Sequence, residues 1–150
     1  MSYERGYYLD ELSLGMEAEM TMDITDEGIQ TFAKLSGDFN PIHVDADYAA
    51  TTPFGKQIAH GAFTASLISA ILGNDLPGPG SIFLEMNMKF RKPAYLGDTV
   101  TAVAEVEDIH PRTGRVKMKV KCMVDGKVII RGDCGVLAPK RPEGDTSKKA

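Results

Sequence analysis

A chain of 150 residues has room for one domain with a buried core. Hydrophobic residues make up 43% of it and charged residues 25%, as in ordinary globular proteins. The net charge of −4 argues against a nucleic-acid-binding surface, and no apolar run is long enough to span a membrane. Because the N-terminus also lacks the apolar stretch of a signal peptide, we expect a cytoplasmic protein.

The first half of the chain is predicted to hold one strand and several helices. Residues 16–22 alternate methionine or alanine with polar residues, which predicts a strand. Thr25 is a typical N-cap for a helix that Gly37 can end. Residues 38–43 are rich in turn formers, and we expect no regular element there. Asp45 can cap a further short helix.

Residues 61–72 read GAFTASLISAIL and predict the element that constrains the fold most. They are apolar on nearly every side, and a helix of this kind is normally buried. The chain after it alternates apolar and polar residues in four segments, which predicts four half-buried strands: 82–91, 100–106, 116–122 and 128–136. Short turns between them indicate antiparallel neighbours.

These elements predict an α+β domain in which about five antiparallel strands curl around one long buried helix. We expect residues 1–138 to form this single domain. Residues 139–150 are charged, contain proline and have almost no apolar side chains, so they are predicted to form a disordered tail. A single curled sheet leaves edges and a face open, which favours a homodimer or a higher multiple.

The two cysteines are predicted to be reduced. The dipeptide Asp125-Gly126 is a strong hairpin signal, and in that hairpin Cys122 would face Ile129 while Cys134 would face Lys117. The thiols would then lie roughly 16 Å apart along the strands. A disulfide needs Cα atoms within about 7 Å.

Asp38, Asn40 and His43 are the first candidates for catalysis, because a carboxylate and an imidazole on one short loop can converge on one water or substrate proton. Pro41 stiffens this loop and favours an extended Asn40. The alternative is structural: Asp38 and Asn40 would only hydrogen-bond a turn, and His43 would start a partly buried element.

Gly61 is the next candidate, because it follows His60 at the start of the buried helix. Backbone N–H groups in a first helical turn lack partners within the helix, and a residue without a Cβ lets a ligand approach them. Such donors can stabilise the oxyanion that forms when a thioester becomes an enolate. Alternatively, Gly61 only lets the chain enter the helix without a clash.

Other kinds of site have no sequence signal. The chain has no glycine-rich phosphate loop, no dinucleotide fingerprint and no Gly-x-Ser-x-Gly nucleophile motif. Its three histidines and two cysteines show no metal-ligand spacing, so we expect no metal site.

The residues around the loop resemble a known signature. The run FAKLSGDFNPIH, residues 32–43, is similar to the Asp-x-Asn-Pro-x-His signature of the MaoC-like, (R)-specific enoyl-CoA hydratases. The similarity continues in Ile58-Ala59-His60-Gly61, in Leu76-Pro77-Gly78, in Phe90-Arg91-Lys92-Pro93 and in Gly97-Asp98, and it covers roughly residues 12–138.

The resemblance implies the hot-dog fold and a dimer with its active sites beside the interface. It implies that Asp38 and His43 hold the catalytic water and move the proton to the α-carbon; it does not decide which of the two is the base. By the same resemblance Asn40 is a supporting hydrogen-bonder, and the Gly61 N–H donates to the thioester oxygen. The regions of Ser69, Leu72 and Val136 correspond to the acyl pocket, with ordinary core packing as the alternative.

The implied activity is reversible syn hydration of a trans-2-enoyl-CoA to a (3R)-3-hydroxyacyl-CoA. Because Leu72 is bulky and apolar, we expect it to limit the depth of the pocket and to favour short-chain substrates. We expect no cofactor, with coenzyme A bound only as part of the substrate. Lys89, Arg91 and Lys92 are candidates to meet its phosphates, although solvated strand residues are the simpler interpretation. The alternatives are a hot-dog acyl-CoA thioesterase and a non-catalytic acyl-thioester binding module. Acyl carrier protein as the carrier stays open, as does the pathway.

Overall fold

The computed structural model describes residues 2–150 and is built on a five-stranded antiparallel sheet. The strands are β1 (Glu17–Asp23), β2 (Ile82–Phe90), β3 (Thr99–Ile109), β4 (Arg115–Val124) and β5 (Lys127–Leu137). Their order across the sheet is β1-β3-β4-β5-β2, and every neighbouring pair is antiparallel. All five predicted strands are therefore confirmed.

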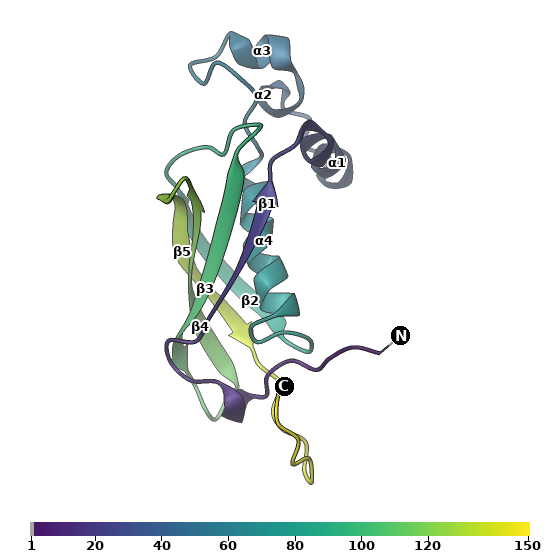
Figure 1. Cartoon of the computed structure of the whole chain (residues 1–150), viewed down its shortest axis with the longest axis vertical. Coiled ribbons are helices and arrows are strands. Elements are labelled where there is room, and N and C mark those ends of the chain that lie inside the picture. The colour runs from purple at the N-terminus through teal and green to yellow at the C-terminus, as the bar shows by residue number, and fades with distance from the viewer. Residues whose placement is uncertain (1) are drawn as a thin grey trace.

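The long helix α4 (Gly61–Asn74) lies along one face of the sheet (Figure 1). Its buried residues are Phe63, Thr64, Ala65, Leu67, Ile68, Ile71 and Leu72. The large apolar ones among them pack into a core shared with β3, β4 and β5. The prediction that this helix is buried all round is wrong for one stripe of small residues, which is exposed in the single chain: Ala62, Ser66, Ser69 and Gly73.

The helices before α4 begin and end where their capping residues predict. In α1 (Asp26–Ser36) the Thr25 hydroxyl accepts a hydrogen bond from the Gly28 N–H at 3.0 Å, and Gly37 ends the helix with a φ of 82°. The Asp45 carboxylate accepts from two N–H groups of α3 (Ala46–Ala50). A short 3-10 helix, η1 (Leu9–Glu11), precedes β1.

The segment predicted to lack regular structure contains one helical turn, α2 (Pro41–Val44). Proline fits the first position of a helix, where no N–H is needed, and the Asn40 side chain accepts from the Ile42 N–H. The turn formers in this segment therefore cap a helix.

The edge strand β2 is more exposed than its alternating pattern predicts. Its large apolar side chains on both faces are between 37% and 56% exposed: Ile82, Phe83, Leu84, Met86 and Phe90. An apolar edge of this kind is normally covered by another chain.

Both cysteines are free and buried, as predicted, although their cross-strand partners differ from the predicted ones. Cys122 pairs with Ile130 and Cys134 with Met118, because the register shifts between Cys122 and Met123. Burial raises the pKa of the Cys122 thiol to about 11 and that of Cys134 to about 12, so both stay protonated at neutral pH.

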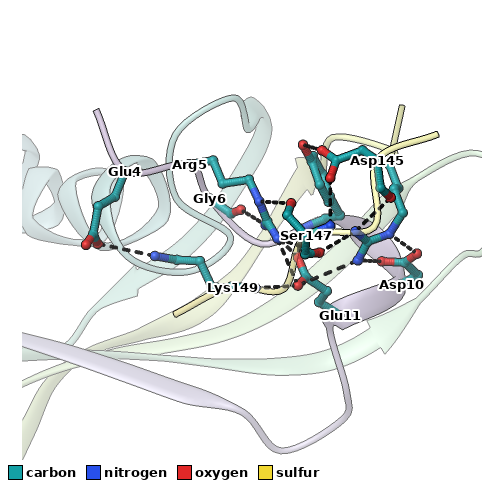
Figure 2. Close-up of polar contacts among 10 residues, drawn as sticks. Glu4, Arg5, Gly6, Asp10, Glu11, Asp145, Ser147 and Lys149 are labelled. Carbon is teal, nitrogen blue, oxygen red and sulfur yellow. Dashed lines mark hydrogen bonds and ion pairs between the residues drawn. The ribbon is translucent and has the colours of Figure 1, made fainter. Parts of the chain in front are cut away.

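Residues 139–150 have no helix or strand, but they lie against the N-terminal arm (Figure 2). The Tyr8 hydroxyl donates to Asp145 at 2.6 Å, and the Arg141 guanidinium donates to Asp10 at 2.8 Å. The Lys149 N–H donates to Glu11 at 2.7 Å. We name this network, residues 4–11 with residues 139–149, the terminal clasp. The bonds that join its two ends connect residues more than 130 positions apart, so a local sequence pattern does not reveal them.

Within the terminal clasp, Arg5 forms an ion pair with Glu11. Its hydrogen bond to Glu11, at 2.7 Å, holds the pKa of that carboxyl down at about 2, so Glu11 stays charged far below neutral pH.

Among the helices of residues 2–150, none has the length and apolar character that crossing a bilayer requires.

Candidate active site

The loop between α1 and α2 places Asp38 with backbone hydrogen bonds on both sides. The Ser36 hydroxyl accepts from the Asp38 N–H at 3.2 Å, and Asp38 Oδ1 accepts from the Asn40 N–H at 3.1 Å. Asn40 in turn caps α2 through its own side chain, at 3.2 Å from the Ile42 N–H. Asn40 therefore acts on the site by shaping the turn that carries Asp38 and His43.

His43 lies in α2, is 9% exposed, and has its ring fixed by a backbone carbonyl. Its Nδ1 lies 2.8 Å from the Ile58 oxygen. A carbonyl oxygen can only accept, so Nδ1 carries the hydrogen and Nε2 of the neutral ring keeps its lone pair. Burial is the main cause that lowers the pKa of His43 below its ordinary value. His43 is thereby kept available as a base near neutral pH.

The structure brings the two predicted acid/base residues together, and it adds a third side chain. Asp38, His43 and His60 each place one side-chain polar atom within 4.8 Å of the others. His60 is 1% exposed, and its Nε2 lies 2.9 Å from the backbone oxygen of Asp38. In the sequence, His60 stood out only as the neighbour of Gly61.

Gly61 is the first residue of α4, and its N–H has no backbone acceptor among the described residues. A Cβ built on Gly61 would lie 2.9 Å from Cε1 of Phe90, a half-exposed side chain, so the glycine also leaves room for that ring. The two interpretations of Gly61 therefore hold together: the missing side chain admits the Phe90 ring and leaves the N–H open.

A cavity of about 310 Å³ is lined by His43 and Gly61, whereas Asp38 and His60 are not among its lining residues. Its walls are mainly apolar and include two cations, Arg91 and Lys92. The lining residues are His43, Phe54, Ile58, Ala59, Gly61, Thr64, Phe90, Arg91, Lys92, Pro93, Ala94, Ile129 and Ile130. A small cavity with one imidazole and an open N–H suits a compact, uncharged reacting group.

The MaoC like domain model matches residues 12–128 of this chain. The chain belongs to the MaoC-like family. It is 43% identical over 135 residues to the (R)-specific enoyl-CoA hydratase of Rhodospirillum rubrum, covering 90% of this chain and 94% of that one. It is 39% identical over 141 residues to the 3-hydroxybutyryl-CoA dehydratase of Methylorubrum extorquens, covering 94% of this chain and 90% of that one.

Solved structures give the same result for this MaoC-like chain. The R-hydratase PhaJ1 from Pseudomonas aeruginosa superposes with a TM-score of 0.86 at 37% identity, over 97% of this chain and 96% of that one. The (R)-hydratase from A. caviae involved in PHA biosynthesis superposes with a TM-score of 0.83 at 36% identity, over 85% of this chain and 98% of that one. The predicted hot-dog fold, a curled sheet around α4, is confirmed.

The three predicted acyl-pocket residues of the MaoC-like chain do not line its cavity. Leu72 and Val136 lie in the core, 2% and 0% exposed, as the alternative of ordinary packing predicts. Ser69 lies instead on the exposed stripe of α4. A part in acyl binding stays a prediction for these residues.

Asp38, His43 and His60 also have the residue types of metal ligands. The His43 and His60 ring centroids lie 4.0 Å apart, and the planes are 31° from parallel. One nitrogen of each ring already faces a backbone oxygen: Nδ1 of His43 lies 2.8 Å from that of Ile58, and Nε2 of His60 lies 2.9 Å from that of Asp38. Each ring therefore has a single nitrogen left for another partner.

Proposed function

We propose that the chain catalyses the reversible syn hydration of a short-chain trans-2-enoyl-CoA to the (3R)-3-hydroxyacyl-CoA. The observation that carries this proposal is the convergence of Asp38 with His43, which lines a small cavity together with Gly61 at the start of α4. The names of the similar proteins, an (R)-specific enoyl-CoA hydratase and a 3-hydroxybutyryl-CoA dehydratase, support the same reaction.

In the proposed mechanism, Asp38 and His43 hold one water molecule and act as a coupled unit. The unit accepts a proton as the water oxygen bonds to C3 of the enoyl group. The electrons of the double bond move towards the thioester oxygen, and the open Gly61 N–H donates to the enolate that forms. The unit then returns a proton to C2 from the same side, which completes a syn addition.

The thioester makes this chemistry possible without a further reagent. Its carbonyl acidifies the α-proton and accepts the negative charge, so the proposed reaction uses no metal or redox cofactor.

The two cysteines are free thiols, in keeping with our proposal that the enzyme works in the reducing cytoplasm.

The experiment that tests the function follows crotonyl-CoA by its enoyl absorbance and by free thiol at the same time. A hydratase removes the absorbance without releasing thiol, which is the result we expect. Thiol release would instead indicate a thioesterase, and a chain that changes neither signal would be a binding module. Either of these results would overturn the proposal.

Arg91 supports coenzyme A as the carrier, because it borders the cavity and also a neighbouring open groove. Lys89 and Arg131 line that groove and lie opposite each other on β2 and β5. Like charges placed opposite each other repel, and a bound anion relieves that repulsion. We propose that the phosphates of coenzyme A pass over Arg91 towards these two cations.

Replacing Arg91 with alanine is expected to raise KM for crotonyl-CoA about tenfold, the worth of one charge-assisted hydrogen bond, with kcat nearly unchanged. The matched substrate is the crotonyl thioester of N-acetylcysteamine, which has no phosphate and should show no change in KM. Arg112→Ala, in the β3–β4 turn, is the control variant. Equal effects on both thioesters would contradict a role for Arg91 in phosphate binding.

A dimer is also proposed, because β2 exposes apolar side chains along a free sheet edge. Light scattering at micromolar concentration is expected to give at least twice the 16.3 kDa mass of one chain. A fully active species with the mass of a single chain would refute this prediction.

A further inference from the structure

His60 is the most buried of the chain's three histidines, and the mechanism above gives it no task. It directly precedes α4, where Gly61 begins the helix. Its ring lies against two others: the centroid of His43 is 4.0 Å away and that of Phe32 is 4.8 Å away. His60 therefore contacts one acid/base residue through its ring and precedes the oxyanion donor in the chain.

One hydrogen bond fixes how the His60 ring is turned. Its Nε2 lies 2.9 Å from the backbone oxygen of Asp38. Since that oxygen can only accept, Nε2 carries a hydrogen. In the part of the chain that the structure describes, the other nitrogen, Nδ1, is buried and has no hydrogen-bond partner. A buried polar atom without a hydrogen-bond partner is destabilising, so a role in packing alone does not explain a histidine at this position.

The same bond is the main polar tie between the Asp38 loop and the rest of the molecule. Within residues 2–150, the other hydrogen bonds of residues 37–40 all go to residues at most four positions away. The bond from His60 spans 22 positions and joins the loop to the start of α4. The distance between the Asp38 carboxylate and the Gly61 N–H therefore depends on His60.

We propose that His60 is a positioning residue, whose bond to Asp38 and contact with His43 hold the acid/base pair in register with the Gly61 N–H. The inference rests on the proposed hydration. Acid/base catalysis depends on such placement, since an error of about 1 Å can cost about 10²-fold in rate. His60 reaches the reacting atoms only through its neighbours.

The contact between the two rings also bears on the charge of His43. Burial is the largest cause that lowers the pKa of His43. The titratable groups that act on it are His60, which lowers the pKa further, and Asp38, which raises it. His60 is thus one of two titratable neighbours that act on the charge of His43.

Two variants separate the hydrogen bond from the packing. His60→Phe keeps a ring between Phe32 and His43 but loses the donor, and His60→Gln keeps an N–H donor but loses the ring. We expect His60→Phe to lower kcat for crotonyl-CoA about tenfold or more, with KM within about threefold, and His60→Gln to keep the larger share of kcat. The reverse order of the two kcat values, or equal values, would overturn the proposal.

A measurement on the unaltered protein keeps the inference testable if His60→Phe does not fold. Nitrogen-15 NMR of the His60 ring should show the hydrogen on Nε2, and a hydrogen on Nδ1 alone would refute the bond to Asp38. This NMR measurement does not depend on catalysis. If the unaltered protein fails to hydrate crotonyl-CoA, the proposed function fails. If it is active and the variants do not follow the predicted order, only the role of His60 fails.

Discussion

Asp38→Asn and His43→Gln are each expected to lower kcat for crotonyl-CoA by about 10²-fold or more, the usual loss when a positioned acid or base is removed. Asparagine keeps an oxygen that can accept from the Asn40 N–H, so the loop should hold its shape while it loses a proton acceptor. Glutamine removes the free Nε2 of His43. The measurement is steady-state hydration, with circular dichroism to show that each variant is folded.

Matched controls exist for both substitutions. Asp47→Asn alters an exposed carboxylate on α3, and His110→Gln alters an exposed histidine outside the cavity. Both should keep nearly full activity. A folded Asp38 or His43 variant that retained more than about a tenth of wild-type kcat would remove that residue from the catalytic unit, since the loss would fall short of the usual range.

Gly61→Ala is expected to lower kcat by about 10²-fold or more, in the range found when one oxyanion donor is lost. The new Cβ would lie 2.9 Å from Cε1 of Phe90, so either the ring or the start of α4 must shift. A shift of α4 takes the N–H donor out of line with the thioester oxygen, and a shift of the ring leaves a methyl group where the thioester must approach the donor. The comparison with unaltered protein uses crotonyl-CoA and a measured melting temperature.

Gly73→Ala is the control on the same helix. A Cβ there meets nothing within 4 Å, and alanine favours a helix by about 0.8–1.0 kcal/mol over glycine. This variant should therefore keep its activity and melt at the same temperature or higher. If Gly61→Ala behaved like Gly73→Ala, the close approach of Phe90 would not set the position of the donor.

Local chemistry predicts most of the fold. Thr25, Gly37 and Asp45 fix their helix ends through hydrogen bonds or a positive φ, which neighbouring residues are enough to indicate. The bulge after Cys122 could not be predicted, because one extra residue in a ladder depends on packing across the sheet and leaves the alternating pattern almost unchanged.

The candidate site, like the fold, is predicted from the sequence only in part. Asp38 and His43 lie five positions apart on one loop, so the sequence alone shows that they can meet. His60 gains its role from a residue 22 positions earlier and from a buried ring, and neither is visible in the order of residues. Leu72 and Ser69 could not be assigned to faces, because α4 is apolar or small on every side.

The terminal clasp makes the two ends of the chain mutually dependent. Cleavage by exopeptidases and fraying normally begin at a loose end. Here the Glu11 carboxylate accepts hydrogen bonds from both Arg5 and Lys149, so removing residues from one end also removes hydrogen-bond partners of the other end. In Figure 1 both ends lie away from α2 and α3, which carry or adjoin the site. A tether attached at either end would therefore begin away from the helices around the site.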